Sequence, residues 1–304
     1  MAQQEGMNLT EFFERFSEED ACRKYLYAKR WPLGFVCPKC GVIDEPFQIV
    51  SRQKYQCKHC NHQTSVTAGT IMDKSRTPLT KWFLAIYLMS ADKRGCSALR
   101  LKRELKVAYD TAWTMSHKIR NAMKKRDEDY QLSGYVEMDE GFFGSPSEGE
   151  GKRGRGTDKA PVVIGLSLDE KGYPEFVKAK VLETTVDGKA IADFTHTAVE
   201  EGSSIASDGL SIYRKLAEKG YIHLPENFNP LENPDHLKWI HVVISNLKAF
   251  LNGTYHGVAK THLQAFLDEF CYRFNRRFWP SQLFARTLLA CSSASPFTRY
   301  DLIG

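Results

Sequence analysis

Residues 134–144 read GYVEMDEGFFG, a strand-like segment in which Asp139 lies among apolar and acidic side chains. Two later segments have the same strand-like character, PVVIGLSLDEKGYPEFVKAKVL at 161–182 and SSIASDG at 203–209. Asp169 to Gly172 indicate a turn inside the first of these segments, which divides it into two strands. We therefore predict four strands in this part of the chain.

Helical patterns at 188–200, 210–220 and 235–251 follow or interrupt these strands. The predicted order is three strands, a helix, a strand and further helices. This order predicts a mixed α/β layer, because a regularly alternating fold would place a helix after every strand. Between the first two strands lies GEGKRGRGTDK, residues 149–159. This loop either contacts a phosphate backbone or is simply solvated, and its candidate contact residues are Lys152, Arg153 and Arg155.

The size and hydropathy of the chain favour a protein of more than one domain without a membrane span. Its 304 residues suffice for about two domains of roughly 150 residues each. The longest apolar run, Trp82 to Met89, is far shorter than the roughly 20 residues of a membrane helix. The first ten residues lack a basic and then apolar signal sequence. We expect a cytoplasmic protein with no membrane partner.

The net charge of +5 is unevenly distributed. Residues 21–126 contain 22 Lys and Arg against 6 Asp and Glu, a net +16, so the remainder of the chain carries −11. A basic half of this kind attracts polyanions, because each neutralised phosphate releases counterions. Nucleic acid is therefore the leading partner, and a merely solvated basic surface is the alternative.

Four of the eight cysteines form two CxxC pairs, Cys37 with Cys40 and Cys57 with Cys60, separated by 16 residues. A short β-hairpin over that interval returns the second pair to the first, and four thiolates then close a tetrahedral zinc site with no open position. We expect a structural zinc ribbon over 34–72; the alternative is four unligated cysteines. The other cysteines are scattered, which favours metal binding in a reducing compartment over disulfides.

Helical patterns flank the ribbon on both sides. Residues 1–33 form a helical segment, and 76–127 contain three predicted helices with a tight turn at 107–109 before the last. These three helices predict a helix-turn-helix whose recognition helix spans about 110–124, with a plain helical packing unit as the alternative. We expect Ala112, Met115, Ile119 and Met123 to face inward. The candidate DNA-contacting residues are Arg100, Lys102, Arg103, Thr111, Thr114, His117 and Lys118.

Asp139 and Asp208 are candidate catalytic carboxylates. Phosphodiester cleavage and strand transfer need an activated nucleophile and a stabilised leaving oxygen, and two divalent ions held by carboxylates supply both. Asp139 lies within the first predicted strand, and Asp208 ends the fourth. If these strands are neighbours, the two carboxylates meet. Considered alone, an Asp at a strand end such as Asp208 is more often a turn former or a helix cap.

A series of motifs resembles a bacterial zinc-ribbon insertion-sequence transposase family over roughly residues 20–290. The motifs are CPKCG, YQCKHC, TAWTMSHKIRNAM, VEMDEGFFG, SDGLSIY, HVVISNLKAFLNGTYHGV and HLQAFLDEFCYRFNRR, in that order. The resemblance implies a ribonuclease-H-like core over 131–304, including C-terminal helices. It also implies a signature of two aspartates, a third Glu, Asn or His, and a lysine, with Asp139 and Asp208 as the two aspartates.

The third position departs from an acidic signature, since KWIHVVISNLKAF at 238–250 contains no Asp or Glu. His241 and Lys248 are seven residues apart and share a helical face, whereas Asn246 lies about 200° from Lys248. Geometry thus favours His241. The family signature with Asn and the preference of Mg²⁺ for oxygen favour Asn246. A nearby acid, Glu232 or Asp235, is a third option, and Lys248 is interpreted as a phosphate-binding lysine.

The resemblance implies a nucleoid-associated DNA transposase that binds terminal inverted repeats, cleaves 3′ ends and joins them to target DNA. Its expected cofactors are structural Zn²⁺ and two catalytic Mg²⁺ or Mn²⁺ ions, and a homodimer on paired ends is its expected assembly. The alternatives are a non-catalytic, transposon-derived DNA-binding protein and a hydrolytic nuclease or resolvase on the same core.

Overall fold

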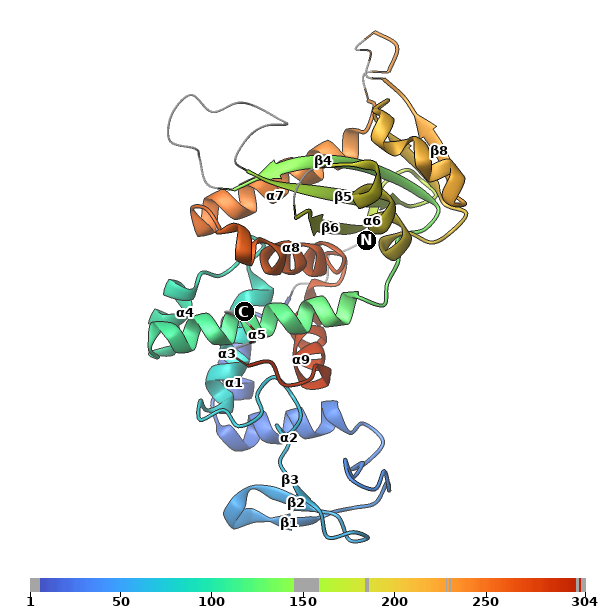
Figure 1. The fold of residues 1–304 in the computed structure, drawn as a ribbon. Helices are drawn as coiled ribbons and strands as arrows, with labels where there is room; N and C mark the ends of the chain where they lie inside the picture. The colour runs from blue at the N-terminus through green and yellow to red at the C-terminus, as the bar shows by residue number, and fades with distance from the viewer. Residues whose placement is uncertain are drawn as a thin grey trace. The chain divides into compact units, whose positions relative to one another are not determined.

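The computed structural model describes residues 6–144, 159–183, 186–227, 229, 231–233, 235–298 and 301. The chain divides into two compact units, Met1–Arg126 with Trp279–Gly304, and Asp127–Phe278 (Figure 1). The first unit contains α1 (Leu9–Phe16), α2 (Glu19–Arg30), β1 (Phe47–Ile49), η1 (Val50–Arg52), β2 (Lys54–Gln56), β3 (Gln63–Thr64), α3 (Leu79–Ala91), α4 (Ala98–Leu105), α5 (Tyr109–Asp127, ending at the boundary), η3 (Pro280–Gln282) and α9 (Leu283–Ser293). The second contains β4 (Tyr135–Phe143), β5 (Ala160–Leu168), β6 (Pro174–Val181), α6 (Gly188–Ala198), β7 (Ser204–Ser207), η2 (Ser211–Lys219), β8 (Ile222–Pro225), α7 (Lys238–Tyr255) and α8 (Lys260–Phe274).

The first unit packs helices from both ends of the chain around aromatic side chains. Phe284 of α9 lies with its ring centroid 5.4 Å from that of Phe16 in α1 and 6.0 Å from that of Phe83 in α3. Ile71 N also donates to the carbonyl oxygen of Cys291. The structure thus differs from the expected range 131–304, because burial of Phe284 brings α9 into the N-terminal unit.

The helices α3, α4 and α5 have the expected helix-turn-helix order. Ser97 caps α4 by accepting from Arg100 N at 3.2 Å, which satisfies an amide that the helix itself leaves unpaired. Lys106 ends α4 in the left-handed conformation (φ 50°), and α5 begins three residues later. This sharp reversal forms the predicted tight turn.

The second unit is built on a five-stranded sheet in the order β6-β5-β4-β7-β8. β4, β5 and β6 are antiparallel neighbours, whereas β7 and β8 run parallel to β4. This is the mixed, ribonuclease-H-like sheet that the motifs imply, and the predicted adjacency of the first and fourth strands is confirmed. β8 was not predicted, and the segment expected as a helix at 210–220 is the 3₁₀ helix η2.

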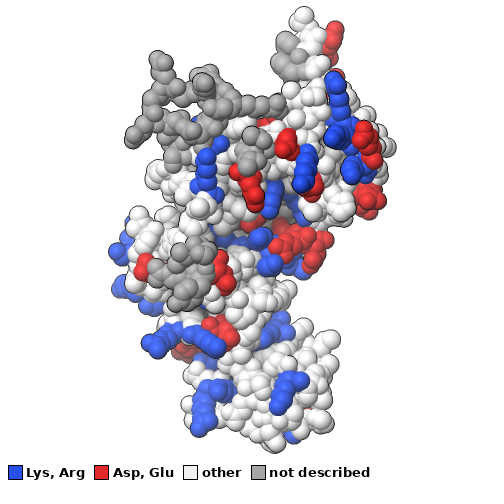
Figure 2. Space-filling model, viewed as in Figure 1, with Lys and Arg blue, Asp and Glu red and all other residues white. Residues whose placement is uncertain are grey.

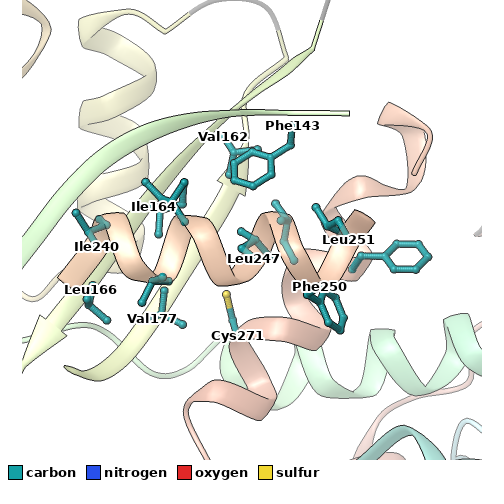
Figure 3. Packing of buried hydrophobic residues seen from close by; sticks show 14 of the residues in the cluster. Phe143, Val162, Ile164, Leu166, Val177, Ile240, Leu247, Phe250, Leu251 and Cys271 are labelled. Atoms are coloured by element: carbon teal, nitrogen blue, oxygen red, sulfur yellow. The ribbon is translucent and has the colours of Figure 1, made fainter. Parts of the chain in front are cut away.

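Helices cover both faces of this sheet. On one face, α7 and α8 pack Ile240, Leu247 and Cys271 against strand residues such as Ile164 and Val162 (Figure 3). On the other face, α6 and η2 pack against alternate strand residues, among them Val136, Met138, Val163 and Ile205. β5 is buried on both sides along nearly its whole length, as expected of an interior strand with continuous apolar sequence. This packed sheet supports the carboxylates of Asp139 on β4 and Asp208 at the end of β7.

Candidate active site and zinc site

The parallel pairing of β4 and β7 places Asp139 and Asp208 side by side. Glu137 is registered with Ala206, and both aspartates lie two residues further along. Carboxylate oxygens of Asp139, Glu140 and Asp208 lie within 4.8 Å of one another. Three converging carboxylates at this spacing suit a divalent cation, which prefers oxygen ligands. The structure thus brings the two predicted aspartates together and adds Glu140, which the sequence reasoning did not select.

Local hydrogen bonds fix both aspartates. Asp139 Oδ1 accepts from Glu140 N at 2.8 Å, and Asp208 Oδ1 accepts from Leu210 N at 3.2 Å, where the chain turns from β7 into η2. Asp208 therefore also serves the turn-forming role that was its alternative interpretation. That role keeps its carboxylate at the carboxyl end of β7.

His241 is the candidate third residue that lies beside the aspartates. It occupies the first turn of α7, and its Nε2 lies 3.4 Å from Asp139 Oδ2. The hydrogen bond with Asp139 raises the pKa of His241 above its ordinary value, although partial burial opposes this shift. The imidazole is more than half exposed, so it remains accessible from solvent.

Glu137 explains why α7 begins at this point. Its buried Oε2 accepts from Ile240 N at 2.7 Å, satisfying an amide of the first helical turn. Glu137 and Asp139 project from the same face of β4 because strand side chains alternate. The bond to Ile240 therefore brings the next residue, His241, to Asp139. Burial raises the pKa of Glu137, with the α7 amides opposing the shift. The sequence does contain a signal for this role, since Glu137 lies two positions before Asp139 and so on the same face of the predicted strand.

The other candidates for the third position lie elsewhere. Asn246 is five residues beyond His241, hence about 140° around α7, and is exposed. Glu232 and Asp235 are exposed residues before α7, and Asp235 forms an ion pair with Lys238 at 3.1 Å. Neither of these two acids belongs to the acidic cluster found among the described residues.

Lys248 lies further along the same face of α7, at the mouth of a small pocket. Its Nζ is 5.7 Å from the ring centroid of Phe143, four residues beyond Asp139 in β4. The pocket has a volume of about 140 Å³, and Lys159 and Asn252 also line it. Two lysines and an amide beside an aromatic ring form a surface that is suited to a phosphate group.

Two matching turns in the first unit bring the four CxxC cysteines together. Gly41 N donates to Cys37 O at 2.9 Å, and Asn61 N donates to Cys57 O at 3.0 Å. Gly41 and Asn61 both have positive φ, which allows the tight turn. β1 and β2 form the predicted hairpin between the turns, and β3 extends it.

The sulfur positions fit a tetrahedral zinc ion. The Sγ atoms of Cys37 and Cys60 are 3.6 Å apart, and those of Cys40 and Cys57 are 3.7 Å apart. A tetrahedron with zinc–sulfur bonds of about 2.3 Å has sulfurs about 3.8 Å apart. Although burial opposes the shift, hydrogen bonds from the backbone at Cys40 and Lys39 lower the pKa of Cys37 to about 6. Although a backbone hydrogen bond at Val42 opposes the shift, burial and the thiols of Cys60, Cys37 and Cys57 raise the pKa of Cys40 to about 12, so the shifts favour a thiolate at Cys37 and not at Cys40.

The structure corrects one predicted DNA-contacting residue of α5. His117 was expected to face outward, but it is buried and its ring centroid lies 4.3 Å from that of Trp113. The reason is that α5 is covered on more than its predicted inner face, with Ser116 and Arg120 also buried. Lys118 is half-buried and donates to Ile71 O at 3.3 Å. Burial lowers the pKa of Lys118.

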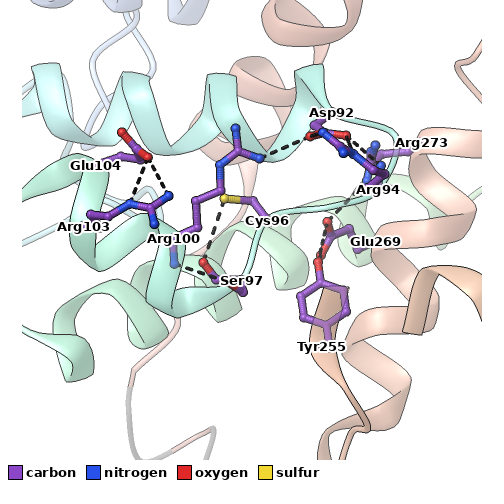
Figure 4. Close-up of polar contacts among 10 residues, drawn as sticks. All are labelled: Asp92, Arg94, Cys96, Ser97, Arg100, Arg103, Glu104, Tyr255, Glu269 and Arg273. Atoms are coloured by element: carbon purple, nitrogen blue, oxygen red, sulfur yellow. Dashed lines mark hydrogen bonds and ion pairs between the residues drawn. The ribbon is translucent and has the colours of Figure 1, made fainter. Parts of the chain in front are cut away.

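The remaining candidates of the helix-turn-helix differ in their surroundings. Arg100 forms an ion pair with Asp92 at 3.2 Å, whereas the exposed Arg103 pairs with its neighbour Glu104 at 3.1 Å (Figure 4). Hydrogen bonds from Arg94 and Arg100, opposed by partial burial, lower the pKa of Asp92 to about 2. Lys102 is exposed, and Thr111 and Thr114 are partly exposed.

Basic side chains are visible over the zinc ribbon. On the face drawn in Figure 2, the ribbon at the bottom of the picture shows Lys and Arg with hardly any Asp or Glu. Lys152, Arg153 and Arg155 lie outside the described residues. No helix in the described ranges combines the length and hydropathy needed to cross a membrane.

Comparison with known proteins identifies the family. The ISXO2-like transposase domain matches residues 131–275, and the transposase zinc-ribbon domain matches residues 17–63. A Halobacterium salinarum protein described as an uncharacterized protein in transposable element ISH50 is 30% identical over 220 residues, which are 67% of this chain and 71% of the relative. The chain belongs to the ISXO2-like transposase family. The acidic cluster of this family member lies within the matched transposase domain, and its four CxxC cysteines lie within the matched zinc ribbon.

Solved structures with similarity to this family member include a transposase complex and a viral intasome. The Mos1 transposase paired-end complex with left transposon end is 10% identical, covers 70% of this chain and 79% of its own, and has a TM-score of 0.29. A simian T-cell lymphotropic virus intasome is 10% identical, covers 57% of this chain and 63% of its own, and has a TM-score of 0.30.

Proposed function

We propose that this transposase cleaves the 3′ ends of its insertion sequence and joins them to target DNA. The observation that carries the proposal is the register of β4 and β7, which places Asp139 beside Asp208, with His241 3.4 Å from Asp139. Family membership supplies the reaction class. The geometry supports the proposal because Asp139 on β4, Asp208 after β7 and His241 on α7 approach one another from three elements.

Three residues are assigned to the metal site in this reaction: Asp139, Asp208 and His241. Two Mg²⁺ or Mn²⁺ ions, when bound, would activate the attacking oxygen and stabilise the leaving 3′ oxygen. Asp139 and Asp208 would hold these ions, and His241 would supply a nitrogen ligand from α7. The histidine makes Mn²⁺ a suitable cofactor, since imidazole is a softer ligand than a carboxylate.

DNA binding is proposed for three surfaces. Lys248 and Lys159 hold a phosphate near the scissile bond, because both line the pocket beside Phe143. Arg103 and Lys102 of α4, with Thr111 and Thr114 of α5, contact the terminal inverted repeats. The zinc ribbon, folded around Zn²⁺, adds basic surface. A homodimer on paired ends follows from the need to process two element ends.

The test is a strand-transfer assay with duplexes carrying the ends of the encoding element and Mg²⁺ or Mn²⁺. We expect wild-type protein to join ends, and Asp208→Asn to reduce joining at least 100-fold while retaining DNA binding. A protein that cuts without joining pre-cut ends would be a nuclease. A protein that binds ends without cutting them would be a non-catalytic DNA-binding protein, and either result overturns the proposal.

A further inference from the structure

Tyr213 links the two strands that carry the aspartates. It lies in η2, five residues after Asp208, and its ring is fully buried against the α6 side of the sheet. Its hydroxyl donates to Glu140 Oε2 at 2.8 Å. Tyr213 thus connects the segment that follows β7 to the acidic residue next to Asp139 in β4.

We propose that Tyr213 is a positioning residue that directs the Glu140 carboxylate to the metal ions held by Asp139 and Asp208. The third acid of the site then comes from β4 itself, which accounts for the absence of Asp and Glu from 238–250 of α7. The inference rests on the proposed function, because it assigns Glu140 to the same metal site.

The strand geometry shows why Glu140 needs such a partner. Adjacent residues of a strand project to opposite faces, so the Glu140 side chain leaves β4 on the face opposite that of Asp139. Its carboxylate nevertheless reaches within 4.8 Å of the carboxylates of Asp139 and Asp208. Three like charges repel one another, and a hydrogen bond to the charged form counteracts that repulsion.

The chemistry of the bond is compatible with metal binding. A carboxylate oxygen has two acceptor positions, so an oxygen that accepts from Tyr213 can also coordinate a cation. Burial and the Glu140 carboxylate raise the pKa of Tyr213 well above its ordinary value. The phenol therefore remains a donor at neutral pH. Removing the hydrogen-bond partner of a metal-binding residue typically lowers metal affinity about 10- to 100-fold.

Tyr221 provides a matched control. It is buried in the same core as Tyr213, and its hydroxyl also lies near acceptors, 3.3 Å from Val199 O and 3.4 Å from Thr195 O. Tyr213→Phe and Tyr221→Phe each remove one buried hydroxyl. Only the first change removes a bond to the acidic cluster.

The experiment measures Mn²⁺ binding to the zinc-loaded full chain by electron paramagnetic resonance of free Mn²⁺, alongside strand transfer over a range of Mn²⁺ concentrations. We expect Tyr213→Phe and Glu140→Gln to weaken Mn²⁺ binding about 10-fold or more. Strand transfer by Tyr213→Phe should recover at high Mn²⁺, and Tyr221→Phe should match wild type in both measurements.

Other results overturn the inference. Unchanged Mn²⁺ affinity in Tyr213→Phe would do so, and so would equal losses in the two tyrosine variants, since these indicate a general loss of packing. A different outcome separates the inference from the proposed function. If Mn²⁺ binding depends on Asp208 and Tyr213 but the protein neither cuts nor joins DNA, the positioning role of Tyr213 stands and the proposed reaction is rejected.

Discussion

His241 has a protonation state that depends on Asp139. In the metal-free protein, the hydrogen bond between them raises the pKa of His241 above its ordinary value. This pair therefore stabilises the fold below the ordinary pKa of histidine, and the contribution is lost as pH rises through the raised pKa. A protonated imidazole does not bind metal, so Mn²⁺ affinity should increase over the same pH rise.

The pKa of His241 can be measured directly by NMR titration of the histidine ring protons. We expect Asp139→Asn to lower this pKa, because the substitution removes the negative charge that favours the imidazolium. Asn246→Ala, on a different side of α7, should leave it unchanged. An unaltered titration in Asp139→Asn would contradict the pairing, and Mn²⁺ binding that is independent of pH in wild type would contradict the ligand role.

The sequence reveals a site residue when local patterns mark it, and misses one that is defined by a contact between distant parts of the chain. Asp139 lies within a predicted strand and Asp208 ends another, so a single assumption, that these strands are neighbours, brings them together. Their catalytic role is what the family resemblance implies. Glu140 and Tyr213 are joined across 73 positions of the chain, a contact that no periodicity encodes. His117 was misplaced for a related reason, since one helical stripe does not show that a helix such as α5 is covered on several sides.

At the scale of elements, two side-chain amides form hydrogen bonds with the backbone along the outer edge of β6. One belongs to α8 and the other to the C-cap residue of α8. Asn275 accepts from Val177 N at 2.8 Å and donates to Val177 O at 3.1 Å. Gln264 accepts from Val181 N at 2.8 Å and donates to Ala179 O at 3.0 Å. The edge of a sheet otherwise presents unpaired backbone groups, so these amides take the place of a further strand.

Asn275→Ala should destabilise the protein by about 2–4 kcal/mol, because it leaves the N–H and C=O of Val177 without this partner in a buried position. The half-buried Gln264→Ala should cost less, since water can replace part of its bonding. Denaturant unfolding of the full chain gives both values. If Asn275→Ala lowers the free energy of unfolding by less than about 0.5 kcal/mol, the edge of β6 does not depend on the Asn275 amide.

Elements with strong periodicity were predictable, whereas those defined by pairing were not. β4, β5 and β7 have continuous or alternating apolar sequence that indicates strands. β8 is a four-residue edge strand that ends in Pro225, and a strand that is so short and mostly exposed gives a weak sequence signal. The helical pattern at 210–220 correctly indicated one buried side, but the segment is a 3₁₀ helix.

At the scale of the whole chain, the last helix returns to the first unit. The two ends of the chain share one aromatic core, in which Phe284 of α9 lies 5.8 Å from Phe12 and 6.3 Å from Tyr87 between ring centroids. Sequence order alone assigns α9 to the preceding catalytic domain. The burial of Phe284 among Phe12 and Tyr87 shows instead that α9 completes the core of the first unit.

Phe284→Ala should therefore destabilise the N-terminal unit by about 3–5 kcal/mol, through lost burial and the cavity that remains. Hydrogen exchange followed by mass spectrometry should show faster exchange in α1 and α3, with β4 and β5 unchanged. Leu289→Ala is the matched control, because Leu289 lies in the same helix but is 40% exposed, and should have little effect. Faster exchange in β4 and β5 rather than in α1 and α3 would assign α9 to the catalytic unit after all, as sequence order suggests.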